Sequence, residues 1–441
     1  MAQHDRGLTR RGFLSNAGAV VGAGVALGAL STISRGSILD EPLIKANSAP
    51  KVDPDATIKL GLIGAGGMGT GHAVAFTRMQ AEGRQNVEIV AIADVCTLHS
   101  ARAKRECEKA GAKHTIDTYQ DYRKLLERPD IHGVVIASPE HWHAQMALDA
   151  IAAGKDVYLE KPMTLRLDEA LRLYRNVNAN PQLMFQVGTQ MMRLPRFHEA
   201  RKVIREGSLG PPTFSQTSYC RNSRDGEWNY YGINKNWKPG ENLDWDAWCG
   251  PAGKRDWDPL IMARWRRYRH FSTGIVGDLL VHVMTPLLLA VDQGWPTRVV
   301  ATGAHIVDKA MENHDLTQLQ VQFETGHTMV VAGSTCNELG LETIIRCQKG
   351  NLYLGGRHLV IRPERLYAEE VEERTIECED IGNDQEQHRV SWLECIRKRE
   401  TPASGVELGT KVMVIVDLAT RSMWDGHAYS FDPKTMQATR I

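Results

Sequence analysis

The residues best suited to acid–base chemistry in this chain are an aspartate and a histidine in the run Gly277-Asp278-Leu279-Leu280-Val281-His282. On a helix, residues spaced i and i+4 lie on one face, so the carboxylate can orient the imidazole and stabilise its protonated form. This pair is therefore a candidate acid–base element, in which Asp278 can support His282. The alternative is a helix-start aspartate with a satisfied, half-buried histidine. Pro286 follows soon afterwards and favours an irregular helix, which is mild support for a site.

A glycine-rich loop offers a second kind of chemistry, the binding of a pyrophosphate. The apolar segment 58–63 runs directly into the loop, and a helix is predicted over 70–82. This is the G-x-G-x-x-G pattern in its strand–turn–helix context. Its first glycine permits the tight turn, its second lets the backbone approach the phosphates, and its third lets the helix pack on the strand. The residues expected to contact a dinucleotide here are Gly64, Gly66, Gly67, Met68 and Gly69.

An acidic residue ends the next predicted strand, 87–93. This residue, Asp94, stands where a carboxylate accepts hydrogen bonds from the adenosine ribose. Because a carboxylate repels a 2′-phosphate, Asp94 favours NAD as the cofactor. Arg102 and Lys104 lie nearby in the sequence and keep NADP possible. A simple strand-end cap is the alternative for Asp94.

Strand and helix patterns continue to alternate up to residue 190. Strands are predicted at 133–137 and 156–159, and helices at 122–126 and 143–153. Such alternation predicts an α/β domain, 58–190, with a doubly wound parallel sheet. Ligands bind at the carboxyl ends of the strands in that fold. The side chains expected there are Ser138, His141, Glu160 and Lys161.

From residue 191 to 441 the pattern becomes one of strands with few intervening helices. Leu319, Val321 and Phe323 alternate with glutamines, as on a strand with one buried face. Further strands are predicted at 328–332, 343–347, 351–354 and 359–362, and helices at 389–399 and 408–423. We therefore expect a second, α+β domain with a large open and mostly antiparallel sheet.

Six of the ten tryptophans fall between Trp228 and Trp265. Their faces could stack on sugar rings, but large aromatic side chains are usually buried. We expect at least half of the six to be anchors in the core of this segment.

Two stretches carry a resemblance to a known family. They are Ser138-Pro139-Glu140-His141-Trp142-His143-Ala144 and the later run from Gly154 that ends in Glu160-Lys161-Pro162. With the glycine loop and the Asp-x-x-x-His run, the chain resembles the Gfo/Idh/MocA oxidoreductases over nearly its whole length after the linker. The resemblance implies that Lys161 contacts both the nicotinamide and the substrate. It also implies that Asp278 and His282 lie in the substrate site, with His282 as the general base and Asp278 as its support. Without that resemblance, Lys161 would be an ordinary turn lysine paired with Glu160.

The same resemblance implies an NAD(P)-dependent oxidoreductase that acts on sugars, sugar acids or inositols and forms a homo-oligomer, a dimer or tetramer. In the simplest mechanism His282 takes the hydroxyl proton, hydride leaves the same carbon, and Lys161 stabilises the developing oxyanion. A glycosidase or epimerase that oxidises its sugar transiently is an alternative, although the family's glycosidase branches do not keep this lysine. A non-catalytic protein that senses sugar or cofactor is a third hypothesis, which the presence of Lys161, Asp278 and His282 disfavours.

The beginning of the chain is predicted to be an export signal. Arg10 and Arg11 precede Phe13-Leu14 and an Ala/Gly/Val-rich run over 17–30, as in twin-arginine signals. A transmembrane anchor is the alternative, but the run is short for the ~20 residues that a span needs. We expect a signal at 1–31, a linker at 32–57 and a periplasmic or cell-envelope location. An exported enzyme meets no nicotinamide pool, so it should hold its cofactor tightly and restore its redox state within each cycle.

Composition argues against several classes of function. The 53 basic and 53 acidic residues cancel, so no electrostatic feature favours nucleic acid or an anionic membrane as a partner. The eight cysteines are scattered without a C-x-x-C pair, and no metal site is predicted. We expect mostly buried free thiols, although export would permit some disulfides.

Overall fold

Short apolar segments separated by helices build the first sheet of the computed structural model, which describes residues 41–46, 52–53 and 55–441. The predicted signal and part of the predicted linker lie outside the described residues. The strands of this sheet are β1 (Ile58–Ile63), β2 (Val87–Ala93), β3 (Asp117–Tyr119), β4 (Gly133–Ile136), β5 (Asp156–Leu159) and β6 (Phe185–Val187). They are parallel and follow the order β3-β2-β1-β4-β5-β6. The predicted doubly wound sheet is confirmed.

Helices cover both faces of this sheet, which explains why its central strands are apolar throughout. They are α1 (Gly67–Ala81), α2 (Thr97–Lys109), α3 (Tyr122–Leu126), α4 (Glu140–Ala152) and α5 (Leu167–Asn178). Helices α1 and α4 each begin three residues earlier than predicted, at Gly67 and Glu140. Gly66 and Pro139 are the N-cap residues, and each helix starts directly after its cap.

A ten-stranded sheet forms the second half of the fold, and the predicted open, mostly antiparallel arrangement is confirmed. Its strands are β7 (Pro212–Cys220), β8 (Pro296–Ala304), β9 (Leu316–Phe323), β10 (Thr328–Ser334), β11 (Ile344–Cys347), β12 (Gly350–Tyr353), β13 (Leu359–Pro363), β14 (Arg374–Ile376), β15 (Tyr429–Asp432) and β16 (Gln437–Arg440). Their order is β14-β13-β12-β11-β7-β10-β9-β8-β15-β16. Only β7 and β10 pair in parallel within the described strands.

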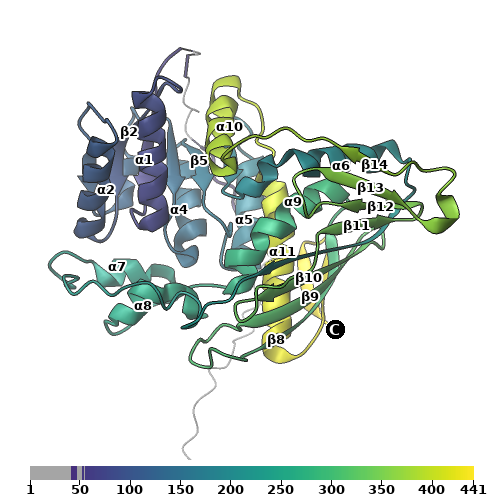
Figure 1. Ribbon diagram of the computed structural model, residues 1–441. Helices are drawn as coiled ribbons and strands as arrows, with labels where there is room; N and C mark the ends of the chain where they lie inside the picture. The colour runs from purple at the N-terminus through teal and green to yellow at the C-terminus, as the bar shows by residue number, and fades with distance from the viewer. Residues whose placement is uncertain (1–40, 47–51, 54) are drawn as a thin grey trace, which may run out of the picture. The chain divides into compact units, whose positions relative to one another are not determined.

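Helices lie against one face of this second sheet (Figure 1). They are α6 (Pro195–Glu206), α9 (Val281–Val291) and α11 (Val406–Asp425), of which α11 packs on β8 and α9 on β7. Along β9, buried side chains alternate with the exposed side chains of Gln318, Gln320 and Gln322, which lie on the opposite face of the sheet.

One helix of the C-terminal half packs on the first sheet instead. Helix α10 (Asp384–Lys398) places Trp392, Leu393 and Ile396 in the apolar core that contains β1 and α1. Its neighbour Arg399 bonds Asp156 through Nη1 at 2.9 Å. The C-terminal chain therefore helps to build the dinucleotide-binding half.

Three further properties concern the part of the chain that the structure describes. Five of the eight free cysteines are buried, as expected. Among the described residues no helix is both long and apolar enough to cross a bilayer, and no group of three or more His, Cys, Asp or Glu side chains could hold a metal ion.

Candidate active site

A cavity of about 420 Å³ lies where β1, β2, β4 and β5 end. The first sheet contributes the glycine loop, Asp94, Ser138, Glu160 and Lys161 to its wall. The opposite wall comes from the segment between β7 and α9, through residues that include Trp237, Trp248, Trp265 and Arg266. The predicted strand ends and the tryptophan segment therefore meet around one space.

The glycine loop leaves room for a ligand at some glycines and not at others. Gly64 has a φ of +89°, and a Cβ on Gly69 would lie 1.9 Å from the Gly64 carbonyl oxygen, so both serve the tight turn and the helix packing predicted for them. A Cβ on Gly66 or Gly67 would meet nothing within 4 Å, and both glycines face the cavity. The open backbone at the start of α1, beside the half-exposed Met68, fits the phosphates of a dinucleotide.

Asp94 lines the cavity just beyond β2. Its Oδ2 accepts from the Ala65 N–H at 2.7 Å and its Oδ1 from the Cys96 N–H at 2.8 Å, which fixes the carboxylate beside the glycine loop. Arg102 is on the same wall, where its Nη2 donates to the Ala65 carbonyl at 2.8 Å. The acidic and the basic candidates for cofactor choice are thus neighbours in space, whereas Lys104 does not line the cavity.

The two site candidates that follow β4, Ser138 in the loop and His141 in α4, differ in their access to the cavity. Ser138 lines the cavity, and its Oγ is buried without a partner in the described structure, so it is available to a ligand. The prediction that His141 contacts the cofactor is not met. Its ring is buried beside Trp248 and Phe271, its Nε2 lies 2.9 Å from the Trp248 carbonyl, and it does not line the cavity. As the second residue of α4, His141 points into the packing below the helix rather than toward the strand end.

Glu160 is held by a buried chain of side chains, not by the surface pairing with Lys161. Arg389 Nε donates to His72 Nδ1 at 2.9 Å, so His72 Nε2 donates to Glu160 Oε1 at 2.8 Å. Burial would raise the pKa of Glu160, but the His72 hydrogen bond and the Lys161 charge outweigh it and lower the pKa to about 2. Glu160 is therefore an anion directly before the lysine of the cavity.

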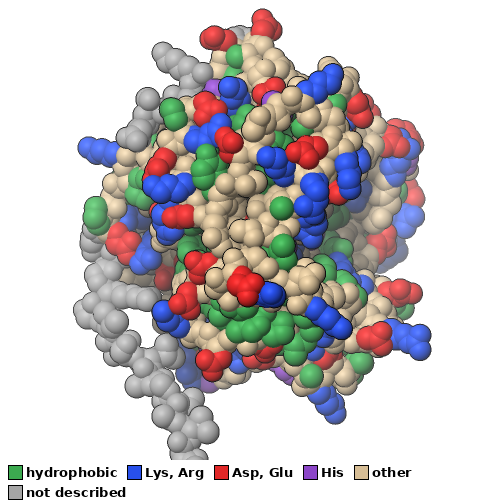
Figure 2. Space-filling model, turned by 90° about the vertical axis from the view of Figure 1, so that its left-hand side faces the viewer, with side chains coloured by type: hydrophobic (Ala, Val, Ile, Leu, Met, Phe, Trp, Pro, Cys, Tyr) green, Lys and Arg blue, Asp and Glu red, His purple; other side chains and the backbone are tan. Residues whose placement is uncertain are grey.

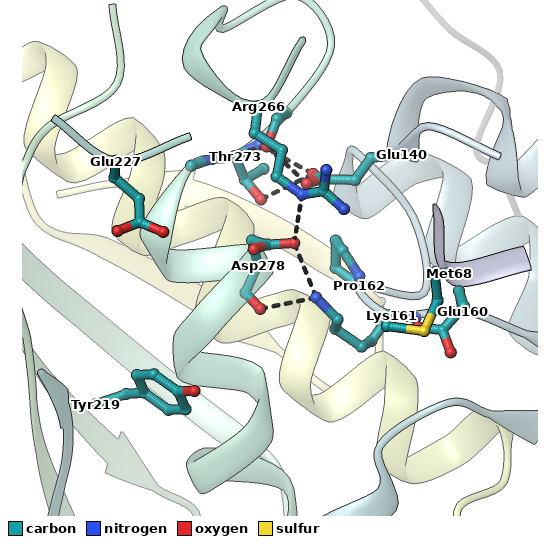
Figure 3. A network of polar contacts seen from close by, with 12 residues as sticks. Met68, Glu140, Glu160, Lys161, Pro162, Tyr219, Glu227, Arg266, Thr273 and Asp278 are labelled. Carbon is teal, nitrogen blue, oxygen red and sulfur yellow. Dashed lines mark hydrogen bonds and ion pairs between the residues drawn. The ribbon is translucent and has the colours of Figure 1, made fainter. Parts of the chain in front are cut away.

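Lys161 and Arg266 converge on one carboxylate (Figure 3). The Lys161 Nζ donates to Asp278 Oδ1 at 2.8 Å and to the Asp278 carbonyl at 2.9 Å. Arg266 Nε donates to the same Oδ1 at 2.9 Å. These two cations hold the pKa of Asp278 far below its usual range although burial opposes them, since the carboxylate is only 9% exposed.

Asp278 therefore does not orient His282, which corrects the predicted pairing. Residues Val276–Leu280 form a π turn before α9. The Asp278 carboxylate there bonds Lys161 and Arg266 instead of the imidazole. No hydrogen bond joins Asp278 to His282 in the described chain, and His282 Nδ1 is buried without a partner. Burial, and then the Lys161 charge, lower the pKa of His282 to about 3.

The predicted irregularity is present, but its cause is different. Helix α9 continues through Pro286 to Val291, and the departure from α geometry is the π turn. His282 lies in the first turn of α9, with its ring centroid 6.2 Å from that of Tyr219. It does not belong to the cavity wall that contains Lys161.

Sequence reasoning missed two residues of this site. One is Arg266, whose only sequence signal is its position beside a tryptophan of the Trp-rich segment. The other is Glu140, which accepts from Ser272 Oγ at 2.6 Å and from the Thr273 N–H at 3.0 Å and so ties α4 to the chain before the π turn. Burial raises the pKa of Glu140 to about 7 against these hydrogen bonds.

The Trp-rich segment is fastened to the first sheet beside the cavity. The Trp248 carbonyl accepts from Trp142 Nε1 at 2.9 Å, and the Thr97 N–H donates to the Asn242 carbonyl at 2.9 Å. Three of the six tryptophans, Trp228, Trp245 and Trp248, are buried, as expected for at least half. The segment contains α7 (Trp245–Cys249) and α8 (Pro259–Arg264). Figure 2 faces the side of the molecule where they lie and shows hydrophobic side chains gathered on its lower part.

Two family models together match almost all of the described chain. One is described as an oxidoreductase family, NAD-binding Rossmann fold, and matches residues 58–189. The other, an oxidoreductase family, C-terminal alpha/beta domain, matches residues 195–440.

Curated relatives include enzymes whose names refer to sugars and cyclitols. The chain is 25% identical to levoglucosan dehydrogenase of Pseudarthrobacter phenanthrenivorans, over 52% of this chain and 49% of the relative. It is 26% identical to inositol 2-dehydrogenase/D-chiro-inositol 3-dehydrogenase of Lactiplantibacillus plantarum, over 39% and 46%. It is 28% identical to α-N-acetylgalactosaminidase of Shewanella oneidensis, over 50% of each. Each match spans about half the length of the relative or less.

Solved structures share the fold. Levoglucosan dehydrogenase in complex with NADH superposes with a TM-score of 0.64 at 19% identity, covering 85% of this chain and 99% of that one. Aldose–aldose oxidoreductase from Caulobacter crescentus, complexed with glycerol, gives 0.64 at 16% identity, covering 85% and 100%.

Proposed function

We propose that this chain, which belongs to the Gfo/Idh/MocA oxidoreductase family, transfers hydride between a carbinol carbon of a sugar, sugar derivative or cyclitol and NAD. One observation carries the proposal. The cavity joins a glycine loop with room for a dinucleotide to Lys161, which uses two of its three N–H groups on Asp278. The third N–H has no partner in the described structure. The levoglucosan and inositol dehydrogenases among the relatives support the substrate class.

The chain's own residues supply binding and proton transfer. NAD, when bound, accepts the hydride. The free N–H of Lys161 donates to the substrate hydroxyl and stabilises the oxyanion that develops there. His282 stays the predicted base: its ring is neutral near pH 7 and can accept a proton, but it lies outside the cavity wall, so the transfer requires the substrate hydroxyl to reach it past Lys161.

Tight retention of the cofactor is part of the proposal. The Trp-rich segment supports it, since hydrogen bonds from Thr97 and Trp142 fasten that segment beside the cavity. We would denature the purified protein and assay the supernatant for NAD(H) and NADP(H). Stoichiometric NAD(H) is expected. Release of NADP(H) would mean that Arg102 rather than Asp94 sets the choice of cofactor. A protein that is purified without cofactor, and that binds added NAD and loses it again on dilution, would refute tight retention.

A second candidate is a redox-neutral reaction in which the sugar is oxidised, cleaved or epimerised, and reduced again. The similarity to α-N-acetylgalactosaminidase favours it. Nitrophenyl glycosides discriminate the two, because only this second reaction releases nitrophenol in an NAD-dependent way without net formation of NADH. A purely binding protein would bind sugars with no turnover at all, and H282A would then behave as the wild type.

We also propose export by the twin-arginine route to the periplasm or cell envelope, on the strength of Arg10-Arg11 and the apolar run behind them. Fractionation of cells that express the full chain tests this. Replacement of both arginines by lysine should keep the protein in the cytoplasm, and an unchanged location would count against the proposal.

A homo-oligomer, a dimer or tetramer, is the remaining proposal. The face of the ten-stranded sheet without helices exposes Phe214 and Val300, which supports a contact there. Light scattering coupled to gel filtration measures the assembly, and a monomer at micromolar concentration would refute it.

A further inference from the structure

Arg266 belongs to the wall of the cavity and comes from the C-terminal half of the fold. It lies in the 3₁₀ turn Trp265–Arg267 that follows α8. Its guanidinium stacks over the Trp265 ring at 4.2 Å, and its Nε donates to Asp278 Oδ1 at 2.9 Å. The side chain is thus fixed on two sides and needs no ligand to order it.

The two terminal nitrogens of this guanidinium, called its fork below, donate no hydrogen bond to the described chain. In Figure 3 the two terminal nitrogens of Arg266 are turned away from Asp278. Neither nitrogen has a hydrogen-bond partner among the described residues, and neither is sealed from solvent. A planar pair of donors of this kind matches the two oxygens of a carboxylate.

Charge near Arg266 also favours an anion. Lys161 and Arg266 share the single carboxylate of Asp278, so the terminal nitrogens of Arg266 have no carboxylate of their own. The Glu140 carboxylate accepts from Ser272 and Thr273 instead. The Glu160 carboxylate lies next to Lys161 and bonds His72, with no ion pair to Arg266 in the described chain.

We propose that Arg266 binds a carboxylate of the substrate, so that the enzyme prefers aldonic or uronic acids over the corresponding neutral sugars and alditols. This inference rests on the proposed function and narrows its substrate class. The phosphates of the cofactor have their own place at the open backbone of Gly66 and Gly67, on the opposite wall. The fork of Arg266 therefore remains for the second ligand of the cavity.

Binding to the NADH-loaded protein tests the inference without requiring turnover. The probes are matched pairs that differ only in a carboxylate: D-glucuronate with D-glucose, and D-gluconate with D-glucitol. Calorimetry should give a tighter Kd for at least one acid than for its neutral partner, by about tenfold to a hundredfold, which is the range for one charge-assisted contact. R266Q should abolish that ratio, and R266K should keep part of it because it keeps the charge.

R264Q is the matched control. The Arg264 guanidinium bonds the Tyr231 carbonyl and Asn229 Oδ1 rather than Asp278, so its loss should leave the ratio unchanged. Acids that bind no better than their neutral partners would overturn the inference while leaving the proposed function intact. An unchanged ratio in R266Q with a weaker Kd for NADH would also overturn it, because Arg266 would then serve the cofactor. If no NAD binds and no sugar is oxidised, the proposed function itself fails.

Discussion

Replacing Lys161 by Met removes one defined interaction, and its cost can be worked out from the contacts of this side chain. Two of the three N–H groups of the ammonium are used on Asp278, so one remains for the substrate oxygen. Removal of a single donor to a developing oxyanion costs about 2.7–4 kcal/mol, or about 10²–10³ in kcat. We expect K161M to lose kcat by that factor, with NAD content unchanged.

The fold should survive this substitution. Breaking a buried ion pair costs about 3–5 kcal/mol when the remaining charge has no partner. Asp278 keeps Arg266 Nε at 2.9 Å, so the loss of unfolding free energy in K161M should be well below that range. Urea denaturation of the wild type and the variant measures this difference.

The assay is the rate at which NADH absorbance appears when the NAD-loaded protein is mixed with saturating substrate, with cofactor content measured in the same preparation. The control is K109M, because Lys109 is exposed on α2 and its ion pair within the described residues is with Glu106, and it should match the wild type. A loss of kcat smaller than tenfold in K161M would refute the role of the free N–H. If the loss of activity is proportional to a loss of bound cofactor, Lys161 instead serves cofactor binding.

Three other predictions concern the same cavity. The fall in the pKa of Glu160 from 4.5 to about 2 corresponds to about 3 kcal/mol of stability, present above pH 4.5 and lost as pH falls toward 2. In urea denaturation at pH 7, the free energy of unfolding of E160Q should be lower than that of the wild type by this amount. A difference in unfolding free energy that stays constant from pH 7 to pH 2 would contradict the prediction. G66A should unfold like the wild type but raise the Kd of NAD about tenfold, about 1.4 kcal/mol, because its Cβ enters open space. G69A should lower the free energy of unfolding by about 1–3 kcal/mol, because its Cβ would clash with the Gly64 carbonyl oxygen. Equal effects of G66A and G69A on stability and on the Kd of NAD would refute these separate roles. Because burial lowers the pKa of His282 to about 3, His282 should contribute no ionisation near pH 6.5 to the pH profile of kcat/KM, and an acid limb at that pH that disappears in H282A would contradict this.

The features that the sequence alone predicted correctly are local ones. The glycine loop depends on six successive residues, and the chemistry of a strand–turn–helix is complete within them. Gly64 is required by its own positive φ angle, and Gly69 by the nearby Gly64 carbonyl oxygen, so both requirements arise within the loop itself. The alternation of apolar segments likewise identifies a parallel sheet without knowledge of side-chain contacts.

The partners in the site were decided by tertiary packing. Asp278 pairs with Lys161, which is 117 positions away, and with Arg266 rather than with the nearby His282. Asp278 lies in a π turn, and no periodicity of side-chain types distinguishes such a turn from an α turn.

Distant segments were placed by the same packing. The Trp-rich segment returns to the first sheet through Thr97 and Trp142, and α10 adds Trp392 to its core. Local propensity depends on neighbours within a few positions, whereas these contacts depend on which surfaces bury one another when the whole chain folds. The sequence by itself therefore determined the dinucleotide loop and the sheet type. The tertiary structure alone decided which charges meet at Lys161, because that choice depends on the burial of groups more than a hundred residues apart.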